Sequence, residues 1–256
     1  MSQRERQTLD SLGRGLELLE LIAQRGSVKL AELPELLGVS RATAFRVLTT
    51  LQARGFVDHV AAEHAYRLGP APLSLASRSY VATLVRLAEP AMARLRERTG
   101  ETVNLAHLRG GELTYVEILE GRHMMRMSAR HGERVPLHCT ALGKATLAAL
   151  PEERRRELAG PEPYERFTPR SPATWRALAK QLCAAEQRGY AIDDEEMDVD
   201  AVCIGAAVRG ADGEPVGALS VAALAARLRD GDHASLGGFV RELAGEIGAA
   251  IARSAG

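Results

Sequence analysis

The stretch from Ser40 to Thr50 gathers side chains that can hydrogen-bond to base edges or phosphates of a nucleic acid. Arg41 and Arg46 carry guanidinium groups, which bind guanine and phosphate, and Thr43 and Thr50 add hydroxyl groups. Ser40 is a residue type that begins helices, because its hydroxyl accepts a hydrogen bond from a free backbone amide. DNA-reading helices place such side chains at their N-terminal end, which enters the major groove. The stretch therefore predicts a recognition helix that runs from Ser40 to Leu51.

The preceding residues predict the helices that would hold it in place. From Leu9 to Arg25 apolar residues recur every three or four positions, so we expect an amphipathic helix that ends at Gly26. Its predicted core-facing stripe is Leu12, Leu16, Leu19 and Ile22. A second, short helix should end before Gly38, and Pro34 fits it only in the first turn, where a missing N–H is tolerated.

The residues after Gly55 predict a β-hairpin. The segments FVDHV and AYRL partly alternate and are joined by four residues that end at His64. Helix, short helix, capped helix and hairpin is the order of a winged helix-turn-helix, whose wing would span Asp58 to Arg67. We expect this domain to cover residues 1–71 and a connecting helix to cover residues 72–87.

An alternative leaves the same residues without a ligand. Residues 1–70 hold nine basic and eight acidic side chains, and the whole chain has a formal net charge of zero, so bulk charge does not indicate a nucleic-acid partner. The helices would then carry solvated charges on a unit that only contacts other proteins. DNA binding in a mobility-shift assay separates this scaffold from a regulator.

The remaining residues, 88–256, mix helical and strand-like patterns. We expect an α+β domain with a mainly antiparallel sheet, because strands and helices interleave irregularly. The predicted helices are 91–98, 140–150, 175–188 and 236–251, and the predicted strands are 102–108, 113–119, 202–208 and 216–221.

The segment from Gly132 to Ala148 carries the most chemistry in this second domain. An extended, proline-bearing stretch leads into a helix, whose first turn would favour an anion, and Lys144 would add positive charge. A helix that is simply capped by Thr140 explains the same residues.

Catalytic and metal sites are weakly supported. His138 and Cys139 suggest a base beside a thiol, but neighbours on an extended segment point to opposite sides. The acidic run Asp193 to Glu196 is typical of a solvated loop, Asp193 excepted. His123, His131 and His138 with Cys139 match no structural zinc spacing. We therefore expect no enzyme, no cofactor and no metal.

The composition indicates an ordinary globular protein of 256 residues. No apolar run approaches the ~20 residues of a membrane span, and the polar start MSQRERQTLD is unlike a signal peptide. Three widely spaced cysteines fit reduced thiols. We expect a cytoplasmic protein.

The chain resembles the IclR family of bacterial transcription regulators along almost its whole length. The segments that carry the resemblance are residues 11–21, SVKLAELPELLGVSRATAFRVLTTLQARGFV from Ser27, YRLG from Tyr66, TGETVNL from Thr99, GERVPLHCTALGKATLA from Gly132, TPRSPATW from Thr168, RGYAIDDEE from Arg188, VCIGAAV from Val202 and GALSV from Gly217. The resemblance implies a winged helix-turn-helix that binds operator DNA, joined to a GAF-like domain that binds a small organic acid or aromatic effector. It also implies a homodimer, or a dimer of dimers.

Two sets of site residues follow from the pattern and the resemblance together. The candidate DNA-contacting residues are Ser40, Arg41, Thr43, Phe45, Arg46, Thr50, His64 and Arg67. The resemblance places the effector pocket at Met124, Met127, Ala141, Leu142, Asp193, Cys203 and Ser220. Thioethers and Leu142 would form a deformable apolar wall, and a filled core without a cavity is the alternative use of the same methionines.

Three positions depart from the family pattern. Pro34 replaces a usual helix former, and Phe45 stands where tyrosine is frequent, which removes a hydroxyl. Ala222 replaces a second hydroxyl that often follows the serine at Ser220. The last change removes a hydrogen bond to a carboxylate and favours a larger or less polar effector.

Overall fold

The computed structural model describes residues 9–76, 80–228 and 233–254, and the chain divides into an N-terminal unit, residues 1–82, and a C-terminal unit, residues 83–256. The first eight residues, where the sequence argues against a signal peptide, lie outside the described part. Among the described residues, no helix is both long enough and apolar enough to cross a membrane.

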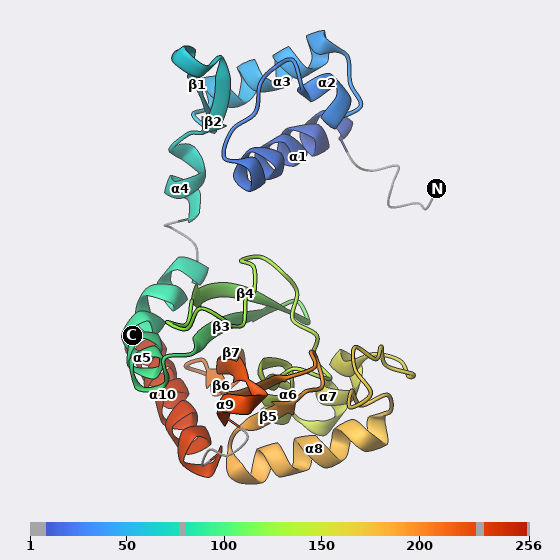
Figure 1. Cartoon of the computed structure of the whole chain (residues 1–256), viewed down its shortest axis with the longest axis vertical. Coiled ribbons are helices and arrows are strands. Elements are labelled where there is room, and N and C mark those ends of the chain that lie inside the picture. The colour runs from blue at the N-terminus through green and yellow to red at the C-terminus, as the bar shows by residue number, and fades with distance from the viewer. Residues whose placement is uncertain (1–8, 77–79, 229–232, 255–256) are drawn as a thin grey trace. The chain divides into compact units, whose positions relative to one another are not determined.

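The N-terminal unit is a winged helix-turn-helix (Figure 1). Its elements are α1 (Asp10–Arg25), α2 (Leu33–Leu36), α3 (Arg41–Ala53), β1 (Val57–Val60), the 3-10 turn η2 (Ala61–Glu63) and β2 (Ala65–Leu68). Strands β1 and β2 pair antiparallel, and backbone hydrogen bonds between Val28 and Tyr66 fasten the hairpin to the loop before α2. Pro34 lies in the first turn of α2, which is the position where the sequence predicts that it is tolerated.

The predicted apolar stripe of α1 is wrong for its first half. Leu18 and Ile22 are buried in the core of this unit, whereas Leu12 is 59% exposed and Leu16 is 53% exposed. Leucines occupy more than one face of α1, so their spacing alone does not identify the face that packs against the core. The exposed leucines remain available to another surface.

Two helices follow the hairpin. Helix α4 (Ala71–Ala76) and helix α5 (Tyr80–Thr99) come before and after residues 77–79 in the chain. These three residues, which belong to the expected connecting helix, lie outside the described part. The sequence predicts separate helices at 73–87 and 91–98, but α5 is continuous through Pro90. Buried side chains before and after the proline, among them Leu84 and Met92, hold the helix against the sheet.

The C-terminal unit is built on an antiparallel sheet with strand order β4-β3-β7-β6-β5. The strands are β3 (Thr102–Arg109), β4 (Glu112–Leu119), β5 (Ala191–Asp194), β6 (Ala201–Arg209) and β7 (Pro215–Leu224). The helices are α6 (Ala141–Ala148), α7 (Glu152–Ala159), α8 (Trp175–Arg188), α9 (Ala225–Leu228) and α10 (His233–Ser254). The expected α+β class with an antiparallel sheet is confirmed, while strand β5 and helix α7 were not anticipated.

The sheet has two different faces. One face packs against α5 and α10 and forms the largest apolar cluster of the chain (Figure 1). That cluster includes Val103, Leu105, Ile204, Leu219 and Val221 from the strands and Leu95, Val240, Leu243 and Ile247 from the helices. Alternate strand residues point to the opposite face, where α6 and the polar residues described below lie.

Candidate functional site

Helix α3 begins at a side-chain cap. The Ser40 hydroxyl accepts a hydrogen bond from the Thr43 backbone N–H at 3.2 Å, as the sequence predicts. The hydroxyls of Ser40 and Thr43 also lie 2.9 Å apart and share a hydrogen bond. The cap therefore fixes where the helix starts and which residues occupy its first turns.

The outward face of α3 carries arginines. Ala44 and Leu48 are buried against the rest of the unit, so the helix presents the opposite face, with Arg41, Phe45 and Arg46, to solvent. Within the described residues, neither arginine forms an ion pair, which leaves both guanidinium groups free to bind an external anion or base.

The hairpin places its two candidate residues differently. His64 occupies the turn with a left-handed backbone (φ 50°), whereas Arg67 donates two hydrogen bonds to the Glu63 carboxylate at 2.9 and 2.8 Å. The carboxylate offsets the charge of Arg67, so this arginine offers less to a phosphate than the unpaired arginines of α3.

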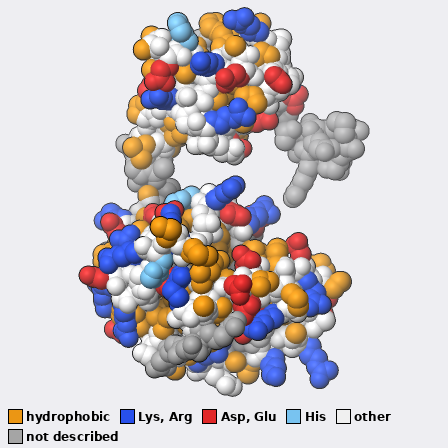
Figure 2. Space-filling model, viewed as in Figure 1, with side chains coloured by type: hydrophobic (Ala, Val, Ile, Leu, Met, Phe, Trp, Pro, Cys, Tyr) orange, Lys and Arg blue, Asp and Glu red, His pale blue; other side chains and the backbone are white. Residues whose placement is uncertain are grey.

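Surface charge is mixed. On the visible face of each unit, basic and acidic side chains intermingle rather than forming a patch of one sign (Figure 2). On this face, charge therefore gives no sign of a nucleic-acid interface.

The C-terminal unit contains a small cavity, of about 190 Å³, between the sheet and the start of α6. Residues from β3, β4, the segment before α6, β5, β6 and β7 line it. They are Thr102, Asn104, Tyr115, Met127, Ser128, Ala129, Glu133, Arg134, Pro136, Thr140, Ala141, Leu142, Asp193, Met197, Asp198, Ala201, Cys203, Ser220 and Ala222. All the predicted effector-site residues except Met124 are in this lining.

Strand register explains why residues far apart in sequence meet here. Asp193 pairs with Cys203, Cys203 with Ala222 and Ala222 with Thr102, so these side chains form one row on one face of the sheet. Asn104 pairs with Ser220, and each lies two residues along its strand from this row, so both side chains lie on the same face of the sheet. Gly205 permits the close approach of α6, since a Cβ there would lie 3.0 Å from the Ala141 backbone.

The polar groups of the cavity are mostly neutral. Burial raises the pKa of Asp193 to about 7, although its carboxylate accepts backbone hydrogen bonds from Glu196 (2.8 Å) and Met197 (3.3 Å). Burial also raises the pKa of Tyr115 far above its usual range, so its hydroxyl remains protonated. Among the described residues the buried Asn104 Oδ1 atom has no hydrogen-bond partner, so it is available to accept a hydrogen bond.

Met124 does not join the cavity; its side chain is 97% exposed. Backbone contacts hold the segment that carries it: Arg227 donates to the Met125 carbonyl at 3.2 Å, and the Thr102 hydroxyl donates to the Met127 carbonyl at 2.8 Å. These anchors turn Met127 to the cavity and leave Met124 outside.

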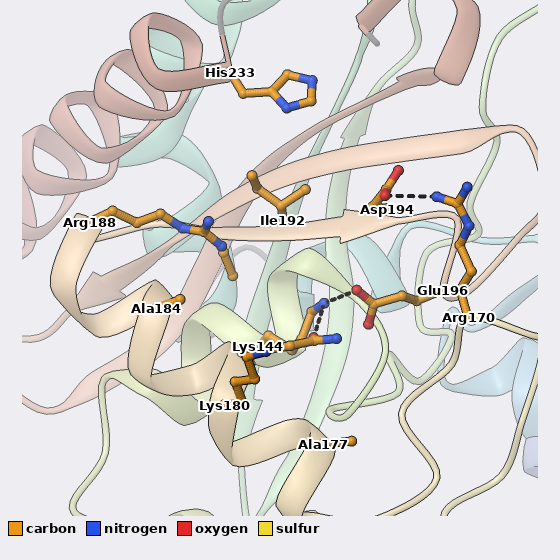
Figure 3. Close-up of a pocket in the computed structure, with 12 residues that line it drawn as sticks. Lys144, Arg170, Ala177, Lys180, Ala184, Arg188, Ile192, Asp194, Glu196 and His233 are labelled. Atoms are coloured by element: carbon orange, nitrogen blue, oxygen red, sulfur yellow. Dashed lines mark hydrogen bonds and ion pairs between the residues drawn. The ribbon is translucent and has the colours of Figure 1, made fainter.

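Lys144 points away from the predicted anion site. Its ammonium group is buried and donates to Glu196 at 2.5 Å and to Gln181 at 2.7 Å, in a hollow of about 870 Å³ beside α8 (Figure 3). In the same hollow Arg170 pairs with Asp194 at 2.8 Å. These side chains therefore bind one another, and Lys144 does not line the cavity, although its positive charge acts on Asp193 and opposes the rise in the pKa of that carboxyl.

The acidic run is only partly solvated. Glu195 and Glu196 are buried, contrary to the prediction, whereas the side chain of Asp194, at the end of strand β5, is exposed as predicted and Asp193 is buried. The apolar residues around Lys144 in ALGKATLA are a sequence signal that this lysine is buried, although they do not indicate its partner. Every residue from Ala141 to Leu147 is buried, and a buried ammonium group needs a counter-charge.

His138 and Cys139 do not form a nucleophile and base. His138 Nε2 lies 2.8 Å from the Glu165 carbonyl and its ring stacks on Tyr164, whereas the Cys139 thiol contacts the Met197 sulfur at 3.8 Å. Burial raises the pKa of Cys139 to about 12, which keeps the thiol protonated. The side chains meet different partners, as expected from their adjacent positions.

Comparisons with known proteins identify the family. Residues 79–249 match the bacterial transcriptional regulator IclR C-terminal family, and residues 11–61 match the IclR helix-turn-helix domain. The chain belongs to the IclR family. The transcriptional repressor IclR of Escherichia coli is 34% identical to this IclR-family protein over 249 residues, which cover 93% of this chain and 89% of the relative.

Solved structures agree with this IclR-family assignment. The Thermotoga maritima IclR structure has a TM-score of 0.82 and 27% identity, covering 96% of this chain and all of the other. An IclR homologue from Microbacterium hydrocarbonoxydans, complexed with 4-hydroxybenzoate, has a TM-score of 0.80 and 25% identity, covering 95% and 99%. This IclR-family protein is thus a DNA-binding transcriptional regulator with a C-terminal effector domain, and its matched relatives are regulators rather than enzymes.

Proposed function

We propose that this IclR-family protein is a cytoplasmic repressor that binds operator DNA as a homodimer through α3. A small organic acid or aromatic compound in the cavity beside α6 then changes its operator affinity. The observation that carries the DNA-binding role is a pair of arginines on the exposed face of a capped helix, neither of which has an ion-pair partner among the described residues. The observation that carries the effector role is the cavity at the row of polar residues across the sheet.

The proposed DNA contacts divide between bases and backbone. Arg41 and Arg46 would reach guanine or phosphate, and Phe45 lies between them. The remaining contacts would come from Ser40, Thr43 and Thr50 on α3 and from His64 and Arg67 on the hairpin, which suit phosphate or minor-groove positions.

Arginine substitutions at the two ends of α3 test the DNA-binding role. Arg46→Ala should weaken operator binding by ~1–3 kcal/mol at fixed salt, because it removes a base or phosphate contact near the helix start. Arg54→Ala is the matched control, since it removes the same charge just after α3 ends. Equal losses in both variants, measured by fluorescence anisotropy, would show that α3 is not the reading helix.

The homodimer is supported by the apolar surface of α1. Leu9, Leu12 and Leu16 are all more than half exposed and follow one another at helical spacing. A single winged helix-turn-helix covers one half-site, and two modules spaced by turns of DNA give the affinity that a unique site requires. Light scattering at micromolar concentration should show a dimer or a dimer of dimers, and Leu12→Glu should weaken association. A monomeric wild-type mass would exclude this proposal.

The cavity favours a small ligand with both apolar and polar groups. Its volume lies below the ~300–1,000 Å³ of drug-sized pockets. Met127, Leu142 and Cys203 supply apolar surface, and Asp193, Ser220 and the start of α6 near Ala141 supply polar groups. A carboxylate near the first turn of α6 would meet the positive end of the helix dipole.

Calorimetry with 4-hydroxybenzoate and a series of small carboxylates tests the effector role. Leu142→Trp should abolish binding because it fills the cavity, whereas Met124→Ala should bind like the wild type because its side chain lies outside. Binding that survives Leu142→Trp would exclude this cavity, and the absence of binding by any small acid or aromatic probe favours a filled core.

Allosteric coupling requires that the ligand bind the DNA-competent and incompetent arrangements unequally, typically by about 1–3 kcal/mol. We propose that segment 72–87, of which residues 77–79 lie outside the described part, transmits this difference between the two units. Mobility shifts with and without a bound probe measure it. A probe that binds tightly without moving operator affinity would refute the coupling.

A further inference from the structure

We propose that Phe45 reads the 5-methyl group of a thymine in the major groove. This inference rests on the DNA-binding function proposed for α3, and it assigns a base to a side chain whose role is otherwise open. Apolar contact with the thymine methyl is one of the ways by which phenylalanine distinguishes base pairs in that groove.

Phe45 does not serve the core of its own unit. Its side chain is 52% exposed, while its neighbours Ala44 and Leu48 are buried and Val47 packs partly against the core. Replacing Phe45 should consequently leave the fold intact. A single exposed apolar side chain is common on protein surfaces, so exposure by itself assigns no role.

The position of Phe45 on α3 supports a role in contacting bases. Phe45 lies one turn after Arg41 and directly before Arg46, on the face that the helix presents to solvent (Figure 1 shows α3 in its unit). Within the described residues neither arginine has an ion-pair partner, so both attract the phosphates on either side of a groove. Docking driven by these two charges places the ring between them against the base edges.

In the free protein the hydroxyl groups around Phe45 form hydrogen bonds within α3, so a phosphate contact by Ser40, Thr43 or Thr50 exchanges one hydrogen bond for another. The Thr49 hydroxyl donates to the Phe45 carbonyl at 2.9 Å, and the Thr50 hydroxyl donates to the Arg46 carbonyl at 2.8 Å. Ser40 and Thr43 share a hydrogen bond at the cap. The arginines thus remain as hydrogen-bond donors for guanine or phosphate, and the aromatic ring remains for a methyl group, which only thymine carries in this groove.

Replacement of thymine by deoxyuridine isolates this contact, since it deletes the methyl group and keeps base pairing. A binding site is first selected from random duplex DNA with the full-length chain, and each thymine is then replaced in turn. The wild type should lose about fourfold in affinity at one thymine per half-site, which is the effect of exposing one methyl group. Phe45→Ala should bind the thymine and deoxyuridine forms equally there.

Two further variants sharpen the outcome. Phe45→Leu keeps an apolar side chain and should retain part of the thymine preference, and Arg46→Ala should bind more weakly but retain all of it. Equal deoxyuridine losses in the wild type and Phe45→Ala, or none in the wild type, would overturn the assignment to Phe45 and leave the DNA-binding function standing. A changed oligomeric mass of Phe45→Ala, with no thymine effect, would assign the ring to a protein contact instead. Failure to select any site would overturn the DNA-binding function and this inference with it.

Discussion

Helices α3 and α6 begin in the same way and end up in opposite surroundings. Each is capped by a hydroxyl that accepts the backbone N–H three residues on, from Thr43 to Ser40 at 3.2 Å and from Gly143 to Thr140 at 2.9 Å. Helix α3 then presents one whole face to solvent, whereas α6 is buried from Ala141 to Leu147. The same local signal therefore marks the start of a helix with an exposed face and the start of a helix that forms the wall of a cavity.

Polar groups on α3 and around α6 meet different requirements, because one helix has a face in water and the other is buried. On α3, Arg41 and Arg46 are exposed to water, so neither needs the ion-pair partner that it lacks among the described residues. Around α6 each charged group must be paired or neutral, since burial penalises an isolated charge. A variant that breaks a buried interaction should accordingly lower the free energy of unfolding more than one that breaks its exposed counterpart.

The largest difference is expected for ion pairs. Lys144→Met leaves the Glu196 carboxylate buried without its counter-charge, and should lower the free energy of unfolding of the C-terminal unit by ~3–5 kcal/mol. The exposed pair Arg154–Glu157 has the same separation, 2.5 Å, so Arg154→Met is a matched control with an expected effect below about 1 kcal/mol.

Urea unfolding followed by tryptophan fluorescence measures both variants, because the only tryptophan, Trp175, lies in the C-terminal unit. The double variant Lys144→Met, Glu196→Gln should recover part of the loss. Similar losses in Lys144→Met and Arg154→Met would show that burial does not set the strength of these pairs.

The next effect concerns the pH dependence of the C-terminal unit. The pKa of Asp193 is about 7 in the folded chain, against 3.8 for an ordinary aspartate, so between these values the folded chain holds a proton that the unfolded chain has lost. The stability from this group is full below about pH 4 and is lost as pH rises through 7.

Asp193→Asn cannot ionise and should flatten this dependence. Relative to the variant, the wild type should lose on the order of 2 kcal/mol of unfolding free energy between about pH 5 and pH 8. Trp175 fluorescence at the two pH values provides the measurement. Parallel pH profiles for the wild type and Asp193→Asn would assign the dependence to other groups.

The smallest effects are expected for the loss of the two helix caps, at Thr140 and Ser40. Thr140→Ala removes a hydroxyl that accepts from Gly143 and donates to the Pro136 carbonyl at 2.6 Å, in buried surroundings, and should destabilise by about 2 kcal/mol. Ser40→Ala leaves the Thr43 backbone N–H to hydrogen-bond with water and should destabilise by about 0.5–1 kcal/mol. Hydrogen exchange of the α6 and α3 amides follows each cap separately, and a larger effect at Ser40 would contradict the comparison.

The sequence by itself determined the features that depend on short-range signals. The cap at Ser40, the hairpin after Gly55 and the bounds of the helix Trp175–Arg188 were predicted and are confirmed. These features follow from backbone hydrogen bonding and side-chain periodicity within a few residues, which neighbouring residue types report directly. Family resemblance gave seven candidate pocket residues from residue types in order along the chain, and all of them except Met124 are among the residues that line the cavity.

Only the tertiary structure decided which faces and which charges are buried. Periodicity placed Leu12 and Leu16 of α1 in the core, yet the fold packs the adjacent face. The partners Lys144 and Glu196 are 52 residues apart, and the edge strand β5 brings them together. Local sequence does not encode such pairings, because the desolvation of a side chain depends on what the whole fold packs against it.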